Sequence, residues 1–99
     1  MSTKDEIRKV ITELCSEDDW GSWEPWWNVT AGSSSEDFTR TKKEFMEVIG
    51  EMIARRLLLA KMKTAGKLTL MPFDPRDLER QIDAASSPEP DRFYWFGTP

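Results

Sequence analysis

The chain has 99 residues, of which 38 % are hydrophobic and 32 % charged, with no histidine, one cysteine and a net charge of −4. This length corresponds to one domain, and the clustered apolar residues exclude a chain that stays disordered for want of a core. One cysteine excludes an intrachain disulfide, and the sequence starts without an apolar signal core, so we expect a cytoplasmic protein. Its apolar runs are too short to span a bilayer.

The charge is unevenly distributed along the chain. Residues 1–39 carry three basic and nine acidic side chains, a net charge of −6, and residues 68–99 carry −3. Between them, residues 40–67 carry eight basic and three acidic side chains, a net charge of +5. A strongly basic nucleic-acid binder would be positive overall, so any nucleic-acid site is expected in this middle segment.

The first helix is indicated by apolar residues at helical spacing, namely Ile7, Val10, Ile11, Leu14 and Cys15. Thr3 and Glu6 have the spacing of a capping box, which predicts a helix from about residue 3 to residue 16. Four of the five tryptophans then fall within residues 20–27. Here Ser22 is expected to cap a short helix that has Pro25 in its first turn.

A longer helix is predicted after a serine-rich loop, with Ser34 and Asp37 at its start. Its apolar face is Phe38, Phe45, Val48, Ile49, Met52, Ile53 and Leu57. From Leu57 to Met62 the pattern favours a strand, followed by a turn at 63–66 and a return strand at 67–71 that ends at Pro72. The alternative is that the helix continues through Met62, because leucine, alanine, lysine and methionine all favour helices.

The C-terminal part begins with a further helix, capped by Asp74 with Pro75 in its first position, which is expected to reach about Ile82. Residues 84–91 have the composition of a linker. The aromatic run Phe93–Phe96 is expected to dock on the core or on a partner. We therefore predict a domain over residues 1–83 and a linker with an aromatic tail over residues 84–99.

Residues that carry chemistry are scarce in this sequence. Without histidine the commonest general base and metal ligand are missing, and one cysteine cannot build a zinc site. No glycine-rich phosphate loop occurs, and Cys15, on the apolar helix face, is expected to be a buried, unreactive thiol. We predict a protein that is not an enzyme, with no catalytic residue, metal, cofactor or small-molecule substrate.

The stretch from Val48 to Pro72, VIGEMIARRLLLAKMKTAGKLTLMP, resembles the third helix and wing of winged helix-turn-helix domains. The resemblance covers residues 3–73 and implies an α+β, mainly α fold: a winged-helix-like three-helix core, a β-hairpin wing and a short C-terminal helix. The tryptophan-rich segment departs from the family pattern where its second helix is expected. The resemblance implies a small DNA-binding or transcription-associated regulatory protein.

In that family the helix beginning near Glu36 would enter the DNA major groove, and the hairpin turn would lie beside it. The DNA-binding residues that the resemblance implies are Thr39, Arg40, Thr41, Lys42, Lys43, Lys61, Lys63 and Lys67. Hydroxyls and cations suit phosphate contacts. The same residues also fit a solvated helix start and a solvated turn.

A protein-interaction module that binds no nucleic acid is the alternative, because tryptophan is enriched at the centres of interfaces. Its candidate residues are Trp23, Trp26, Trp27 and Trp95. Trp26 and Trp27 are adjacent and point about 100° apart on a helix, so at least one is expected to be partly exposed. Trp20, Trp23 and Trp27 could instead fill the core, and the long helix or the aromatic tail could form a homodimer.

Overall fold

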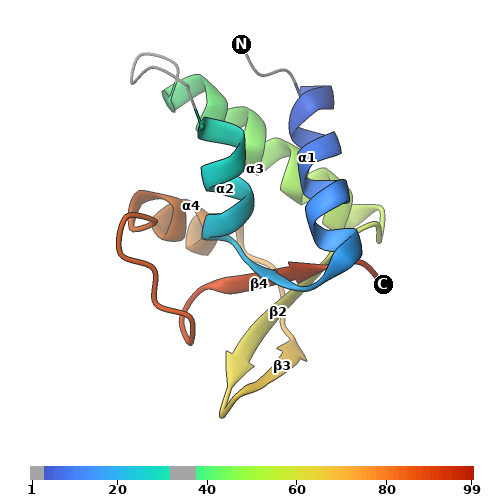
Figure 1. Cartoon of the computed structure of the whole chain (residues 1–99), viewed down its shortest axis with the longest axis vertical. Coiled ribbons are helices and arrows are strands. Elements are labelled where there is room, and N and C mark those ends of the chain that lie inside the picture. Colours follow the sequence, from blue (N-terminus) through green and yellow to red (C-terminus); the bar gives the residue numbers. More distant parts are fainter. Residues whose placement is uncertain (1–3, 32–37) are drawn as a thin grey trace.

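The computed structural model describes residues 4–31 and 38–99, which form the predicted helices and hairpin in the predicted order, together with two strands that were not predicted (Figure 1). The elements are α1 (Lys4–Glu17), β1 (Trp20–Gly21), α2 (Trp23–Thr30), α3 (Phe38–Ala54), β2 (Leu59–Thr64), β3 (Lys67–Leu70), α4 (Pro75–Asp83) and β4 (Tyr94–Gly97). The α+β class is confirmed. The predicted caps at Thr3, Ser34 and Asp37 lie outside the described residues.

The four strands form one antiparallel sheet in the order β1-β4-β2-β3. Phe96 of β4 lies opposite Trp20 of β1 on one side and opposite Ala60 of β2 on the other. Residues 84–99 therefore differ from the predicted linker and tail, because their last part is an inner strand. The aromatic run does dock on the core, since Phe93, Tyr94 and Phe96 are all buried.

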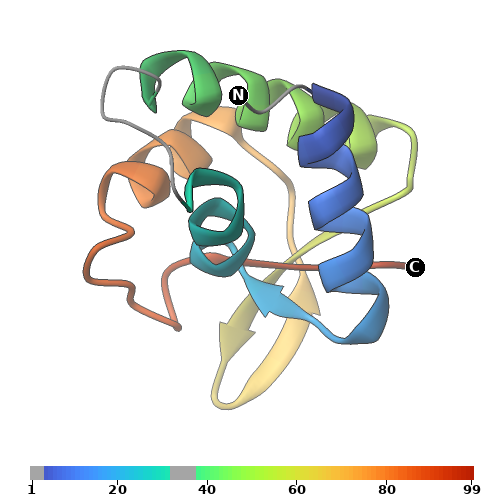
Figure 2. The same ribbon diagram turned by 45° about the horizontal axis from the view of Figure 1, so that its top comes forward.

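The hydrophobic core lies between the helices and one face of the sheet (Figure 2). Ile7 and Ile11 of α1 meet Phe45 and Ile49 of α3, and Phe96 closes the core from the sheet side; all five are fully buried. The predicted apolar faces of the first and third helices therefore do face the core, except that Phe38 is 43 % exposed and Leu57, beyond the end of α3, is 50 % exposed.

Helix α3 ends at Ala54, three residues before the end of its apolar pattern. Arg56 has a positive φ of 59°, and the Leu57 N–H donates to the Met52 carbonyl at 2.8 Å. This is the Schellman ending, in which a left-handed residue reverses the chain after a helix. The alternative of a helix through Met62 is wrong, because Leu59–Thr64 is a strand.

The predicted hairpin is confirmed, with a turn of only two residues. Thr64 lies opposite Lys67, and between them Ala65 and Gly66 have positive φ values of 51° and 79°. Two successive residues of positive φ form the type I′ turn, whose twist matches that of paired strands.

Helix α4 is capped as predicted, with Asp74 Oδ1 accepting from the Arg76 N–H at 2.9 Å. Ser22, by contrast, stands at the start of α2 without making a side-chain cap. Its hydroxyl donates instead to Oε1 of buried Gln81 in α4 at 3.0 Å, and the same oxygen accepts from the Tyr94 N–H at 2.9 Å. One amide thus joins α4 to both β4 and the start of α2.

Candidate functional site

The polar residues at the start of α3 differ in exposure. Thr39, Arg40 and Lys43 are exposed, whereas Thr41 is only 3 % exposed and faces the core. Lys42 is half-buried, and its Nζ donates to Asp83 Oδ1 of α4 at 2.9 Å. Thr41 is therefore not available to a phosphate, and the charge of Lys42 is balanced within the domain.

The lysines of the hairpin are also partly engaged. Lys61 Nζ lies 3.1 Å from both carboxylate oxygens of Asp19, in a half-buried ion pair. Gly97 leaves room for this pair, because a Cβ there would lie 1.7 Å from Asp19 Oδ1. Lys63 Nζ sits 4.9 Å from the ring centroid of Trp95, the geometry of a cation–π contact. Lys67 is exposed and makes no ion pair with a described residue.

The two basic groups predicted to share a DNA face lie far apart on the molecule. Figure 1, drawn with the longest axis vertical, places the start of α3 near the top and the β2–β3 turn at the bottom, and Figure 2 agrees. The chain measures 37 Å along that axis. The fold does not bring residues 39–43 and 61–67 together.

The four candidate tryptophans fall into two groups. Trp26 is 8 % exposed and packs edge-to-face on Phe45, with ring centroids 5.4 Å apart, so it belongs to the core. Its neighbour Trp27 is 43 % exposed, and its Nε1 donates to the Ala85 carbonyl at 3.1 Å. The prediction that at least one of this pair is partly exposed is confirmed.

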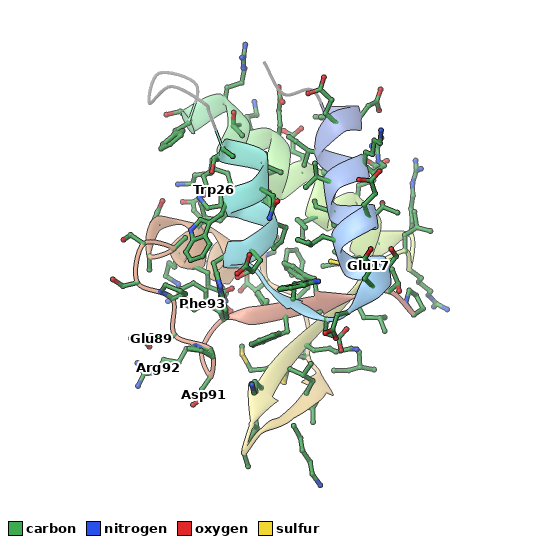
Figure 3. All side chains as sticks on the ribbon, in the orientation of Figure 1. Glu17, Trp26, Glu89, Asp91, Arg92 and Phe93 are labelled. Carbon is green, nitrogen blue, oxygen red and sulfur yellow. The ribbon has the colours of Figure 1, made fainter. Side chains whose placement is uncertain are left out.

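Trp23 and Trp95 form the second group, beside the sheet. Their rings meet edge-to-face at 5.4 Å, and Trp23 meets Phe93 in the same way at 5.6 Å. Trp95 Nε1 donates to the Pro90 carbonyl at 2.9 Å, which holds the loop before β4 against the sheet. Figure 3 labels Phe93 at the end of this loop and shows Glu89, Asp91 and Arg92 projecting from it into solvent.

The face of the sheet away from the core is covered only in part by the described residues, since Trp23 of α2 packs on Trp95 and Asp19 pairs with Lys61. Residues directly opposite each other in paired strands point to the same face, and successive residues alternate. Ala60, Tyr94 and Phe96 are buried and point to the core. The residues next to them in sequence, and the residues opposite or two positions along from these in the paired strands, point away from the core. We call the second set the open sheet face: Leu59, Lys61, Lys63, Leu68, Leu70 and Trp95.

Leu70 is the residue of this face that the candidate sites missed. It is 65 % exposed, more than any other large hydrophobic side chain among the described residues. Adjacent Met71 is also exposed, and both lie at the edge of the sheet because β3 is its last strand. The alternation of Leu68 and Leu70 was visible in the sequence, but it did not reveal which face would be covered.

Two surface hollows lined by described residues show no built ligand site. One of about 580 Å³ lies between α3 and α4 around Met46 and Pro75, and one of about 480 Å³ lies between α2 and α4 around Trp27. Among the described residues the buried side-chain polar atoms without a partner are Trp20 Nε1 and Glu44 Oε2, and neither residue lines these hollows.

Cys15 is buried as predicted, and burial, with a smaller contribution from the Asp19 charge, raises the pKa of its thiol to about 12. A thiol with so high a pKa is almost wholly protonated near neutrality and is a poor nucleophile. In residues 4–31 and 38–99 no cluster of acidic, cysteine or histidine side chains could hold a metal ion. The helices in these ranges are also too short or too polar to cross a membrane.

Comparisons with protein-family models, with curated proteins and with solved structures found no match to this chain.

Proposed function

We propose that this domain is a protein-interaction module that binds its partner through the open sheet face and the adjoining edge of β3. The observation that carries the proposal is the 65 % exposure of Leu70 on an edge strand. Edge strands with exposed apolar residues pair readily with other chains, and proteins commonly blunt or cover them. A binding surface is a function that accounts for leaving this edge open.

The aromatic side chains next to this edge support the proposal. Trp95 is held by its hydrogen bond to Pro90, by the ring of Trp23 and by the ammonium of Lys63. A tryptophan already fixed in one position loses little conformational entropy when a partner covers it. Such rigid aromatic side chains are frequent among residues that dominate binding energy.

The test compares two exposed leucines. Leu70→Gln alters the open sheet face, and Leu57→Gln, at a position 50 % exposed but outside the sheet, is the matched control. A nuclease-treated extract of the source cells is passed over the wild type, a protein that it retains is purified, and the affinity of this protein for the wild type and for both variants is measured by calorimetry. We expect Leu57→Gln to bind like the wild type and Leu70→Gln to lose most of the affinity. Equal binding by all three would contradict the proposal.

As a second candidate we propose a winged-helix domain that binds DNA. The order of three helices followed by a hairpin supports it, as do the exposed Thr39, Arg40, Lys43 and Lys67. Two features weigh against it: β4 lies between β1 and the hairpin, and the basic groups lie at opposite ends of the long axis.

An amide NMR titration with a mixed-sequence DNA duplex separates the two candidates. DNA binding would shift residues 39–43 and 61–67 at low salt, and the shifts would fade as salt rises because phosphate contacts release counterions. Lys43→Glu and Lys67→Glu would each weaken them. If the domain is a protein-interaction module, we expect no such shifts. Salt-sensitive shifts confined to residues 39–43 and 61–67 would instead favour the winged-helix domain that binds DNA and would overturn the proposal of a protein-interaction module.

A further inference from the structure

We propose that the edge of β3 binds an extended segment of a partner protein, apolar with an acidic end, which adds to the sheet as a fifth strand in antiparallel orientation. The inference rests on the proposed function and specifies the kind of partner. It follows from the hydrogen-bonding groups, the side chains and the charge of the β2–β3 hairpin.

The hydrogen-bonding groups of β3 alternate between its partner strand and solvent. The residues flanking a two-residue turn form a hydrogen-bonded pair, here Thr64 and Lys67. Four residues further along the chain, the Met71 N–H donates to the Ala60 carbonyl at 3.0 Å. Every second residue of β3, counted from Lys67, is therefore hydrogen-bonded to β2. Lys67, Thr69 and Met71 therefore pair with β2, and the peptide groups of Leu68 and Leu70 point outward.

This free edge has a defined length. Leu68 and Leu70 each offer one N–H and one C=O, so an incoming strand can form four hydrogen bonds. Pro72 follows without an N–H and ends the row of donors at that side. Leu68 and Leu70 have no strand on their outer side among the described residues, since β3 is last in the sheet order.

The side chains of β3 define what the incoming strand should carry. Leu68 and Leu70 lie on the open sheet face, so residues opposite them gain apolar contact if they are branched aliphatic. Lys67 lies on the other face, opposite a third incoming position. Its ammonium has no ion-pair partner within the described part of the chain, unlike that of Lys61. An acidic residue at this position would supply one.

Charge distinguishes this occupant from a second copy of the chain. Residues 59–71 contain three lysines and no acidic residue. Because Lys61 is paired with Asp19, each hairpin keeps only Lys63 and Lys67 without an acidic partner among the described residues. Two β3 edges paired with each other would bring four such lysines together, which is unfavourable. The positive charge of the hairpin attracts an acidic segment and repels a second copy of the hairpin. The edge of β3 therefore favours a chain of different sequence.

The test uses the ¹⁵N-labelled full chain and a capped probe peptide of sequence Gly-Val-Thr-Val-Glu-Gly. Its two valines and its glutamate would lie opposite Leu70, Leu68 and Lys67. We expect amide shifts confined to β3 and its neighbours, and slower hydrogen exchange at the Leu68 and Leu70 N–H groups. The already bonded Thr69 N–H should change little. The control peptide, with lysine in place of glutamate, should bind roughly tenfold more weakly at low salt.

Two variants link the binding to the edge. Lys67→Glu should reverse the preference between the two peptides. Leu68→Pro removes one outward N–H while leaving the bonds to β2, since proline is tolerated where an edge N–H faces solvent, and it should weaken both peptides. If Leu68→Pro does not fold, the reversal by Lys67→Glu still decides the inference.

Three outcomes would overturn it. Shifts elsewhere, or no binding of the acidic peptide, would reject strand addition, and concentration-dependent shifts of β3 in the protein alone would assign the edge to a second copy. These failures are distinguishable from failure of the proposed function. If Leu70→Gln weakens binding of the captured partner protein, the open sheet face binds protein even when the peptide does not add as a strand.

Discussion

Individual buried side chains make contacts that their residue types do not suggest. Glutamine is usually exposed, yet Gln81 is buried and its one oxygen accepts from both Ser22 and the Tyr94 N–H. Serine before a helix usually caps it, but Ser22 is turned toward Gln81. The cap and the bridge compete for one hydroxyl, and here the buried acceptor takes it.

Replacement of Gln81 tests the importance of this bridge. Gln81→Leu keeps the volume and leaves the buried Tyr94 N–H and Ser22 hydroxyl without a partner, so we expect a loss of roughly 2 kcal/mol in the free energy of unfolding. Glu79→Leu, on the exposed side of the same helix, should change it by less than about 0.5 kcal/mol. Urea denaturation followed by circular dichroism measures both. Similar values for the two variants would contradict the role given to Gln81.

Cys15 gives a prediction for pH. Because burial raises the thiol pKa from 9.0 to about 12, the unfolded chain releases this proton at lower pH than the folded one. The contribution to stability is complete below pH 9 and is lost as the pH rises from 9 to about 12. We expect the free energy of unfolding of Cys15→Ala to fall less steeply over this range. Parallel curves for variant and wild type would refute the assignment.

The reactivity of the same thiol is a second measurement of its burial. In the folded protein Cys15 should react with a disulfide reagent at mildly alkaline pH at least roughly 100-fold more slowly than in guanidinium, where the thiol is exposed. Comparable rates in the two conditions would mean that α1 opens easily.

Among the elements, the hairpin depends most on its turn. Ala65 has a φ of 51°, a conformation that costs an L-residue about 1–2 kcal/mol and that asparagine tolerates better. We expect Ala65→Asn to stabilise the domain by roughly 0.5 kcal/mol and Ala65→Val to destabilise it, since a β-branched side chain is strained there. Thermal melting of the wild type and both variants gives the values. An Ala65→Val variant that melts at the wild-type temperature would argue against a type I′ turn.

At the scale of the whole molecule, the last strand completes the fold. β4 pairs with both β1 and β2, and it brings buried Tyr94 and Phe96 to the core. A chain that stops after Asp91 should lose its cooperative thermal transition, because removal of such core aromatics costs about 3–5 kcal/mol each. A chain lacking only the exposed Thr98 and Pro99 is the control and should melt like the wild type. Cooperative melting of the shorter chain would place the domain boundary at the earlier position.

The local pattern of the sequence determined the helices, the hairpin turn and the cap at Asp74, because each depends on residues within a few positions of one another. It also indicated the buried thiol of Cys15 from its place on an apolar helix face. The end of α3 was placed three residues late, since a left-handed arginine at position 56 is not a recognised stop signal.

Only the tertiary structure decided which segments became neighbours. The pairing of Trp20 with Phe96 and of Asp19 with Lys61 joins residues that are distant in sequence, and periodicity within a segment carries no information on its partner. Such pairings turned the aromatic tail into an inner strand, balanced the charge of Lys61 with Asp19 and of Lys42 with Asp83, and left Leu70 at an open edge. The candidate surface follows from them, because burial and charge compensation are properties of the assembled chain.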